Sequence, residues 1–166
     1  MSASFTYVKE SYLFNKKTLV YHGMLECSSQ ATGLEPVWSM HMGDNMASLN
    51  SGRNGALIMT ATTDRIKRDQ AQFSYQGKMT NGGFDANKST WAFYDFDGKR
   101  YEWIAGIMQN CWKLEDPEGQ VVAQYIGMSR DYKVKGTLNF QSKVNESLIA
   151  LVLLTTRLIN YDAASK

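Results

Sequence analysis

The sequence predicts a mainly β protein in which a closed antiparallel β-barrel encloses a hydrophobic C-terminal helix. Residues 148–154 are apolar at every position, so this segment needs apolar surface on all its sides. Many short β-prone runs precede it, and turn sequences typical of hairpins join two pairs of them. A sheet closed around the helix covers it and leaves no strand edge exposed. We expect residues 1–166 to form one domain, because this length suits a single core.

The first elements are short runs rich in β-branched and aromatic residues. Residues 5–8 and 18–22 are expected to be neighbouring strands, with a polar turn at residues 15–17. In residues 37–42 the alternation places Trp38, Met40 and Met42 on the core face of a strand. Residues 43–55 are rich in Asn, Ser and Gly without an apolar period, and are expected to form a long mobile loop.

The middle of the chain combines a strand signal with the densest charge cluster. Residues 56–62 predict an inner strand that runs into the cluster at residues 64–69. Residues 70–76 alternate loosely around Phe73 and Tyr75. Residues 77–87, which contain Gly82 and Gly83, are expected to form another loop.

Two hairpins are predicted next. Residues 91–96 and 99–104 flank Asp97-Gly98, a pair that favours a two-residue turn, with Trp91 and Phe93 placed for cross-strand packing on the second strand. Residues 110–114 and 120–125 flank a turn at residues 116–119, where proline presets φ and glycine ends the turn. Residues 132–140 form a last alternating strand.

The C-terminal helix is expected at about residues 145–160. Leu and Ala outnumber β-branched residues in its apolar run, while Asn145 supplies an N-cap and Glu146 a first-turn acid. A bilayer span needs roughly 18 or more mostly apolar residues. Thr155, Thr156 and Arg157 interrupt the run before that length, so we expect a core helix and no transmembrane segment.

Several motifs resemble the tubby C-terminal-like superfamily, which includes tubby domains, LURP-one-related proteins and phospholipid scramblases. The likeness is strongest to a fungal family of unknown function within it. The motifs lie in the C-terminal half, at residues 90–93, 97–103, 112–114, 122–125 and 148–159. The resemblance implies the barrel with a central helix. Tubby domains bind phosphoinositides and scramblases act at membranes, but no phosphate-binding residue of the superfamily can be matched to a position here.

Composition and motifs argue against several functional classes. A net charge of +2 gives no general attraction to nucleic acid, so no nucleic-acid partner is predicted. The N-terminus lacks a signal sequence, which predicts an intracellular, cytoplasmic protein. Cys27 and Cys111 are too few and too far apart for a disulfide framework or a metal cluster. With His22 and His41 they could form a Cys/His pair, but ordinary core or surface positions are the commoner role. No cofactor or metal site is predicted, and a non-enzymatic role is favoured over an enzyme without excluding one.

The candidate binding residues are Arg65, Lys67 and Arg68, because three cations within four residues suit an anionic headgroup. A solvated strand end is the alternative, since Asp64 and Asp69 offset part of the charge. A thinner basic set comprises Arg130, Lys133 and Lys135. We therefore predict a non-enzymatic binding module for anionic phospholipid, peripheral at membranes, or for a protein partner. The alternative is a small-molecule binder or enzyme with a pocket at the barrel mouth.

Overall fold

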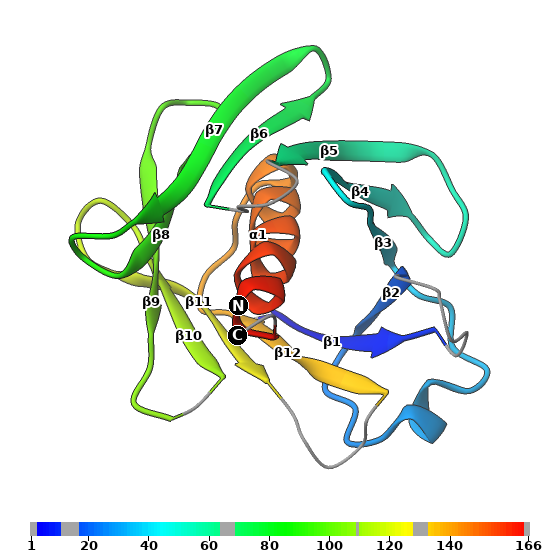
Figure 1. Ribbon diagram of the computed structural model, residues 1–166. Helices are drawn as coiled ribbons and strands as arrows, with labels where there is room; N and C mark the ends of the chain where they lie inside the picture. Colours follow the sequence, from blue (N-terminus) through cyan, green and yellow to red (C-terminus); the bar gives the residue numbers. More distant parts are fainter. Residues whose placement is uncertain (1–2, 11–16, 64–68, 109, 128–132, 165–166) are drawn as a thin grey trace.

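A computed structural model describes residues 3–10, 17–63, 69–108, 110–127 and 133–164, with the side chains of the final helix described as far as Ile159. Within these residues the chain forms twelve strands, a short 3-10 helix and one α-helix (Figure 1). The elements are β1 (Ala3–Lys9), β2 (Lys17–His22), η1 (Ser28–Ala31), β3 (Trp38–Met42), β4 (Met46–Ser51), β5 (Leu57–Thr63), β6 (Gln70–Tyr75), β7 (Lys78–Asp85), β8 (Thr90–Tyr94), β9 (Arg100–Ala105), β10 (Cys111–Glu115), β11 (Val121–Gly127), β12 (Val134–Phe140) and α1 (Glu146–Ala164).

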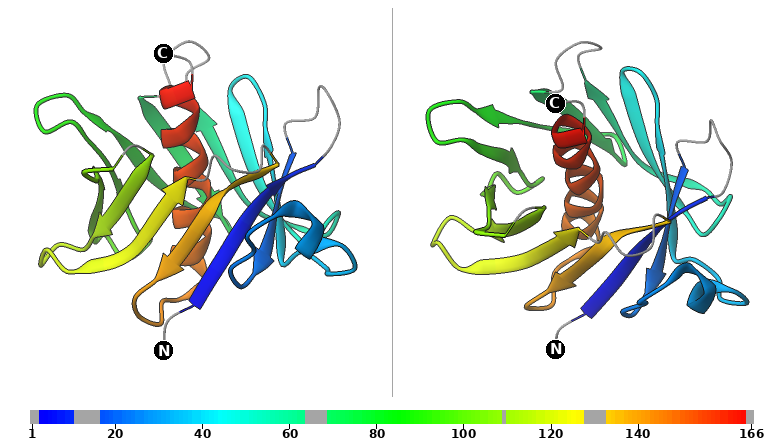
Figure 2. Two further views of the ribbon diagram at one scale, coloured as in Figure 1. Left: turned by 90° about the horizontal axis from the view of Figure 1, so that it is seen from below. Right: turned by 60° about the horizontal axis from the view of Figure 1, so that its bottom comes forward.

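The strands form a closed barrel in which each strand pairs with its neighbours in the chain. Every pairing is antiparallel, and β1 closes the ring by pairing with both β2 and β12. Odd-numbered strands therefore all run the same way, toward the mouth at which α1 ends (Figure 2). The predicted fold class, a closed antiparallel barrel around a C-terminal helix, is confirmed.

The helix α1 fills the barrel as the apolar run predicts. The side chain of Asn145 caps its first turn, because Oδ1 accepts a hydrogen bond from the Leu148 backbone N–H at 2.8 Å. Leu151 and Leu154 have no exposed surface, and they join inward-facing residues such as Met40 and Phe73 in one core cluster. The core is thus a helix surrounded by one face of a sheet.

Two segments predicted as loops are strands. Residues 43–55 contain β4, whose Ala47 and Leu49 face the core. Residues 77–87 contain β7, in which Gly82 sits against β8. A Cβ at Gly82 would lie 2.8 Å from both the Trp91 ring and the Ala92 carbonyl oxygen, so glycine here permits close backbone approach and does not mark a turn.

The aromatic hairpin has a longer turn than predicted. Trp91 pairs with Trp103 and Phe93 with Tyr101, as expected. The ladder ends at Tyr94 and Arg100, so the two-residue turn at Asp97-Gly98 is wrong. Instead Asp95 Oδ1 accepts the backbone N–H groups of Asp97 at 2.9 Å and Lys99 at 2.8 Å. The Asp95 backbone N–H also donates to the Lys99 carbonyl at 2.8 Å, which closes a three-residue loop over residues 96–98 that the dipeptide rule does not describe.

A second apolar cluster lies on the outer wall of the barrel. Val8, Leu19, Tyr21 and Val134 point outward from β1, β2 and β12, and Ala31 of η1 covers them. The connection between β2 and β3 that carries η1 crosses the outside of the barrel at this point (Figure 2). This connecting segment, residues 23–37, is called the strap below.

Candidate functional site: a basic recess under the strap

The predicted site residues Arg65, Lys67 and Arg68 lie outside the residues that the structure describes. The described residues that bracket them, Thr63 and Asp69, lie at the mouth where α1 ends, because β5 runs toward that mouth and β6 runs away from it. The site assignment therefore stays a prediction. Of the thinner basic set, Lys133 and Lys135 are described and Arg130 is not.

A recess of about 470 Å³ opens on the outer wall between the strap and the strands β1 and β2. Its floor is the outer apolar cluster, contributed by Val8, Leu19, Tyr21 and Ala31. The hydroxyl residues Ser28, Ser29 and Thr32 of the strap line one side. This volume falls within the range of small-ligand sites, and the recess lies on the wall of the barrel, away from the central helix.

The rim of the recess carries three basic residues and one acidic residue, Lys9, Arg53, Lys133 and Glu10. The Glu10 carboxylate lies 3.8 Å from Arg53 and 3.6 Å from Lys17, so both ion pairs draw on the same carboxylate. Lys17 also donates to Asn54 Oδ1 at 2.8 Å. Among the described residues that line the recess, three basic side chains therefore outnumber one carboxylate.

Strand register brings these separated positions together. Lys9 ends β1, and its backbone N–H donates to the Lys133 carbonyl at 2.6 Å, just where the β1–β12 register shifts between Tyr7 and Val8. Arg53 belongs to the turn between β4 and β5, where Gly52 adopts a φ of +59°. Each cation is isolated in the sequence, so no local motif marks the rim. The rim could be predicted only from the order of the strands in the closed ring, in which β1 pairs with β12.

The histidine and cysteine residues lie on different segments, and the Cys27 thiol contacts the Ser29 hydroxyl at 3.0 Å. His22 ends β2, whereas His41 pairs with Lys17 at the start of β2, so the length of a strand separates the imidazoles. Burial lowers the pKa of His41, and the Lys17 ammonium lowers it further while Glu10 opposes the change. Among the described residues, no group of three His, Cys, Asp or Glu side chains could hold a metal ion.

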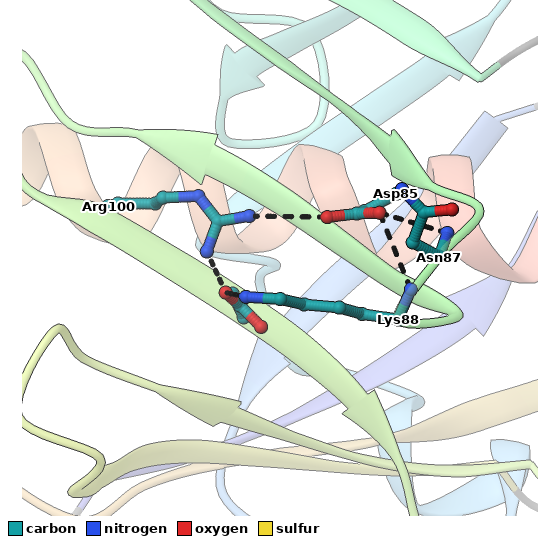
Figure 3. A network of polar contacts seen from close by, with 5 residues as sticks. Asp85, Asn87, Lys88 and Arg100 are labelled. Carbon is teal, nitrogen blue, oxygen red and sulfur yellow. Dashed lines mark hydrogen bonds and ion pairs between the residues drawn. The ribbon is translucent and has the colours of Figure 1, made fainter.

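A second recess, of about 390 Å³, lies over β7, β8 and β9 and differs in its charge. Arg100 pairs with Asp85 at 4.0 Å and also with Glu102, while Lys88 lies 3.8 Å from Glu102 (Figure 3). Asp85 Oδ1 also accepts the backbone N–H groups of Asn87 and Lys88. The cations and carboxylates of this network balance, so the second recess offers no excess charge to a ligand.

Among the helices that the structure describes, none has the length and apolarity needed to span a membrane.

Comparison with known proteins identifies the fold. No family model and no curated protein matches the chain. The X-ray structure of the protein AT5G01750 from Arabidopsis thaliana, a LURP-one-related protein, is similar with a TM-score of 0.63 at 10% sequence identity. The match covers 96% of this chain and 91% of that chain. The two proteins share the tubby-like fold that the sequence motifs indicate.

Proposed function

We propose that this protein is a non-enzymatic binding module that docks on anionic phospholipid surfaces through the recess under the strap. The observation that carries the proposal is the combination of an apolar floor with a rim of three cations and one carboxylate. Peripheral membrane binding depends on the same two terms, which are burial of apolar side chains and attraction of basic side chains to anionic lipid.

The strap carries two exposed apolar side chains, one of which lines the recess. Met24 is 64% exposed and Leu34 is 46% exposed, and Leu34 lines the recess. Solvated apolar side chains next to cations suit an interface between headgroups and acyl chains. The resemblance to tubby domains and scramblases supports a lipid as partner, although shared fold does not assign function.

The test is co-sedimentation with vesicles of phosphatidylcholine alone, with phosphatidylserine added, and with a phosphoinositide added. Wild-type protein should sediment only with the anionic vesicles, and less at high salt, because surface charges are screened. Each basic residue near such a surface contributes about 1 kcal/mol, so Arg53→Ala with Lys133→Ala should weaken binding by on the order of 2 kcal/mol. The loss of binding free energy should be somewhat smaller than this, because Glu10 already offsets part of the Arg53 charge.

The matched control is Lys78→Ala with Lys99→Ala, which removes the same charge at the β6–β7 and β8–β9 turns. This control should bind like wild type. If wild-type protein stays in the supernatant with every vesicle, the lipid proposal fails, and a protein partner or small molecule becomes the better reading of the recess. If the control loses as much binding as the recess variant, charge alone drives association and the recess is not the site.

A further inference from the structure

A second cationic cluster lies close to the mouth of the barrel where α1 ends. Arg157 projects from α1 one residue after Thr156, whose hydroxyl lies 2.8 Å from the Tyr7 hydroxyl of β1. Burial raises the pKa of the Tyr125 hydroxyl of β11, and the Arg157 guanidinium lies close enough to that hydroxyl to lower this pKa in part. That hydroxyl in turn donates to the Lys135 carbonyl at 3.2 Å. The helix, β1, β11 and β12 therefore meet around Arg157.

Arg157 has an incomplete set of partners. Its Nε is buried and lacks a hydrogen-bond partner among the described residues. Within that same part of the chain, no carboxylate pairs with Arg157, Lys9 or Lys135. A guanidinium does not give up its proton, and a partly buried one without a counter-ion is costly. Among the residues that the structure describes, these three cations therefore have no carboxylate partner.

Two lysines reinforce the positive field at this position. Lys9 follows Tyr7 by two positions on β1, and Lys135 precedes Gly136, the residue that pairs with Tyr7. Burial lowers the pKa of Lys135, and the charges of Lys9 and Arg157 lower it further, so both of these cations lie within electrostatic range of Lys135. An anion bound among them would relieve this repulsion.

We infer that Arg157, with Lys135 and Lys9, forms an oxyanion site centred on Arg157 at the mouth of the barrel where α1 ends. The planar guanidinium suits two oxygens of a phosphate group, and the lysines add charge without directional demand. The phosphate could be free in solution or belong to a lipid headgroup. The inference does not depend on the proposed docking surface, although Lys9 also lines that recess.

The probe is inorganic phosphate, followed by thermal unfolding and titration calorimetry against chloride at equal ionic strength. Phosphate should raise the melting temperature of the wild type. Arg157→Met should remove that rise, with affinity at least about tenfold weaker, because a hydrogen bond to a charged group is lost. Lys113→Met, which removes one positive charge from β10, and the recess variant Arg53→Ala with Lys133→Ala should keep the rise.

Three results would overturn the site: no phosphate effect in the wild type, an equal effect in Arg157→Met, or an equal loss in Lys113→Met. If Arg157→Met does not fold, Lys135→Met provides a second test, and this variant should weaken phosphate binding several-fold. Vesicles containing a phosphoinositide distinguish the source of the phosphate. A headgroup ligand predicts weaker sedimentation of Arg157→Met, whereas a free phosphate ligand predicts unchanged sedimentation, and the calorimetric result decides the site in both cases.

Discussion

The indole N–H of Trp103 on β9 donates a hydrogen bond to the Thr155 hydroxyl of α1 at 2.8 Å, with both side chains fully buried. The Thr155 hydroxyl in turn donates a hydrogen bond to the Val152 carbonyl at 3.0 Å. The wall of the barrel thereby supplies a hydrogen-bond partner to a polar side chain in the buried part of the helix. The bond fixes the rotation of the helix relative to the strands, since apolar packing alone is less directional.

The first prediction is energetic coupling between Trp103 and Thr155. Thr155→Val should destabilise the fold by about 1–3 kcal/mol, because it leaves a buried indole N–H without an acceptor. Trp103→Phe with Thr155→Val should cost less than the sum of the single changes, with a coupling of about 0.5–1.5 kcal/mol. Urea unfolding of the four proteins measures this. Strict additivity would mean that the hydrogen bond contributes nothing net.

The second prediction is a loss of stability in alkaline solution. Burial raises the pKa of Tyr125 from 10.0 to about 12, and it raises the pKa of Tyr7 as well. Between these values unfolding releases a proton, so stability that is intact below pH 10 falls as the pH rises toward 12. The pKa shift of Tyr125 alone corresponds to a loss of about 2–3 kcal/mol in the free energy of unfolding. Unfolding of the wild type and Tyr125→Phe across this range should show a shallower decline in the variant, and equal slopes would contradict the assignment.

The third prediction concerns the helix as the filling of the barrel. Leu151 is fully buried, so Leu151→Asp should cost more than about 4 kcal/mol by placing an unpaired charge in the core. Leu57→Asp is the control, because that side chain is 58% exposed, and its melting temperature should change little. Truncation before Val144 should abolish cooperative unfolding. A truncated chain that stays soluble and melts sharply would show that the barrel does not need its helix.

The fourth prediction keeps the basic cluster at residues 65–68 under test. Replacing Arg65, Lys67 and Arg68 by alanine should weaken vesicle binding by on the order of 3 kcal/mol, less what the neighbouring acids offset. The same assay with the recess variant separates the two surfaces. Equal binding of wild type and triple variant would remove this cluster from the binding site while leaving the recess in place.

The fold follows from the sequence because its strongest signals are local. An all-apolar helix and alternating strands specify a covered helix and a half-buried sheet, and Asn145 marks the helix start as expected. The errors arose where composition resembled a loop. In β4 the polar residues alternate with the core residues Ala47 and Leu49. In β7, Gly82 is needed because a Cβ at this position would collide with the ring of Trp91 on the neighbouring strand. These reasons depend on neighbours that a single segment does not show.

The candidate sites were less accessible to sequence reasoning. Lys9, Arg53 and Lys133 are far apart in the chain. The pairing of β1 with β12 brings Lys9 and Lys133 together, and Arg53 reaches the same recess through its ion pair with Glu10. Arg157 is visible in the sequence as a cation next to an apolar run, but that position indicates only that the run is too short for a membrane span. Its role as a partly buried charge depends on Tyr125, which lies on a different strand.

Amide chemical-shift mapping with anionic bicelles tests the docking surface most directly, because it locates the contact on the protein. If the protein docks through the recess, the perturbed amides should cluster there, at Lys9, Ala31, Leu34 and Arg53. The amides of the second recess, at Asp85 and Arg100, should stay unchanged. Zwitterionic bicelles should leave both sets unchanged. Perturbation confined to the β7–β9 face, or spread evenly over the barrel, would contradict binding through the recess under the strap.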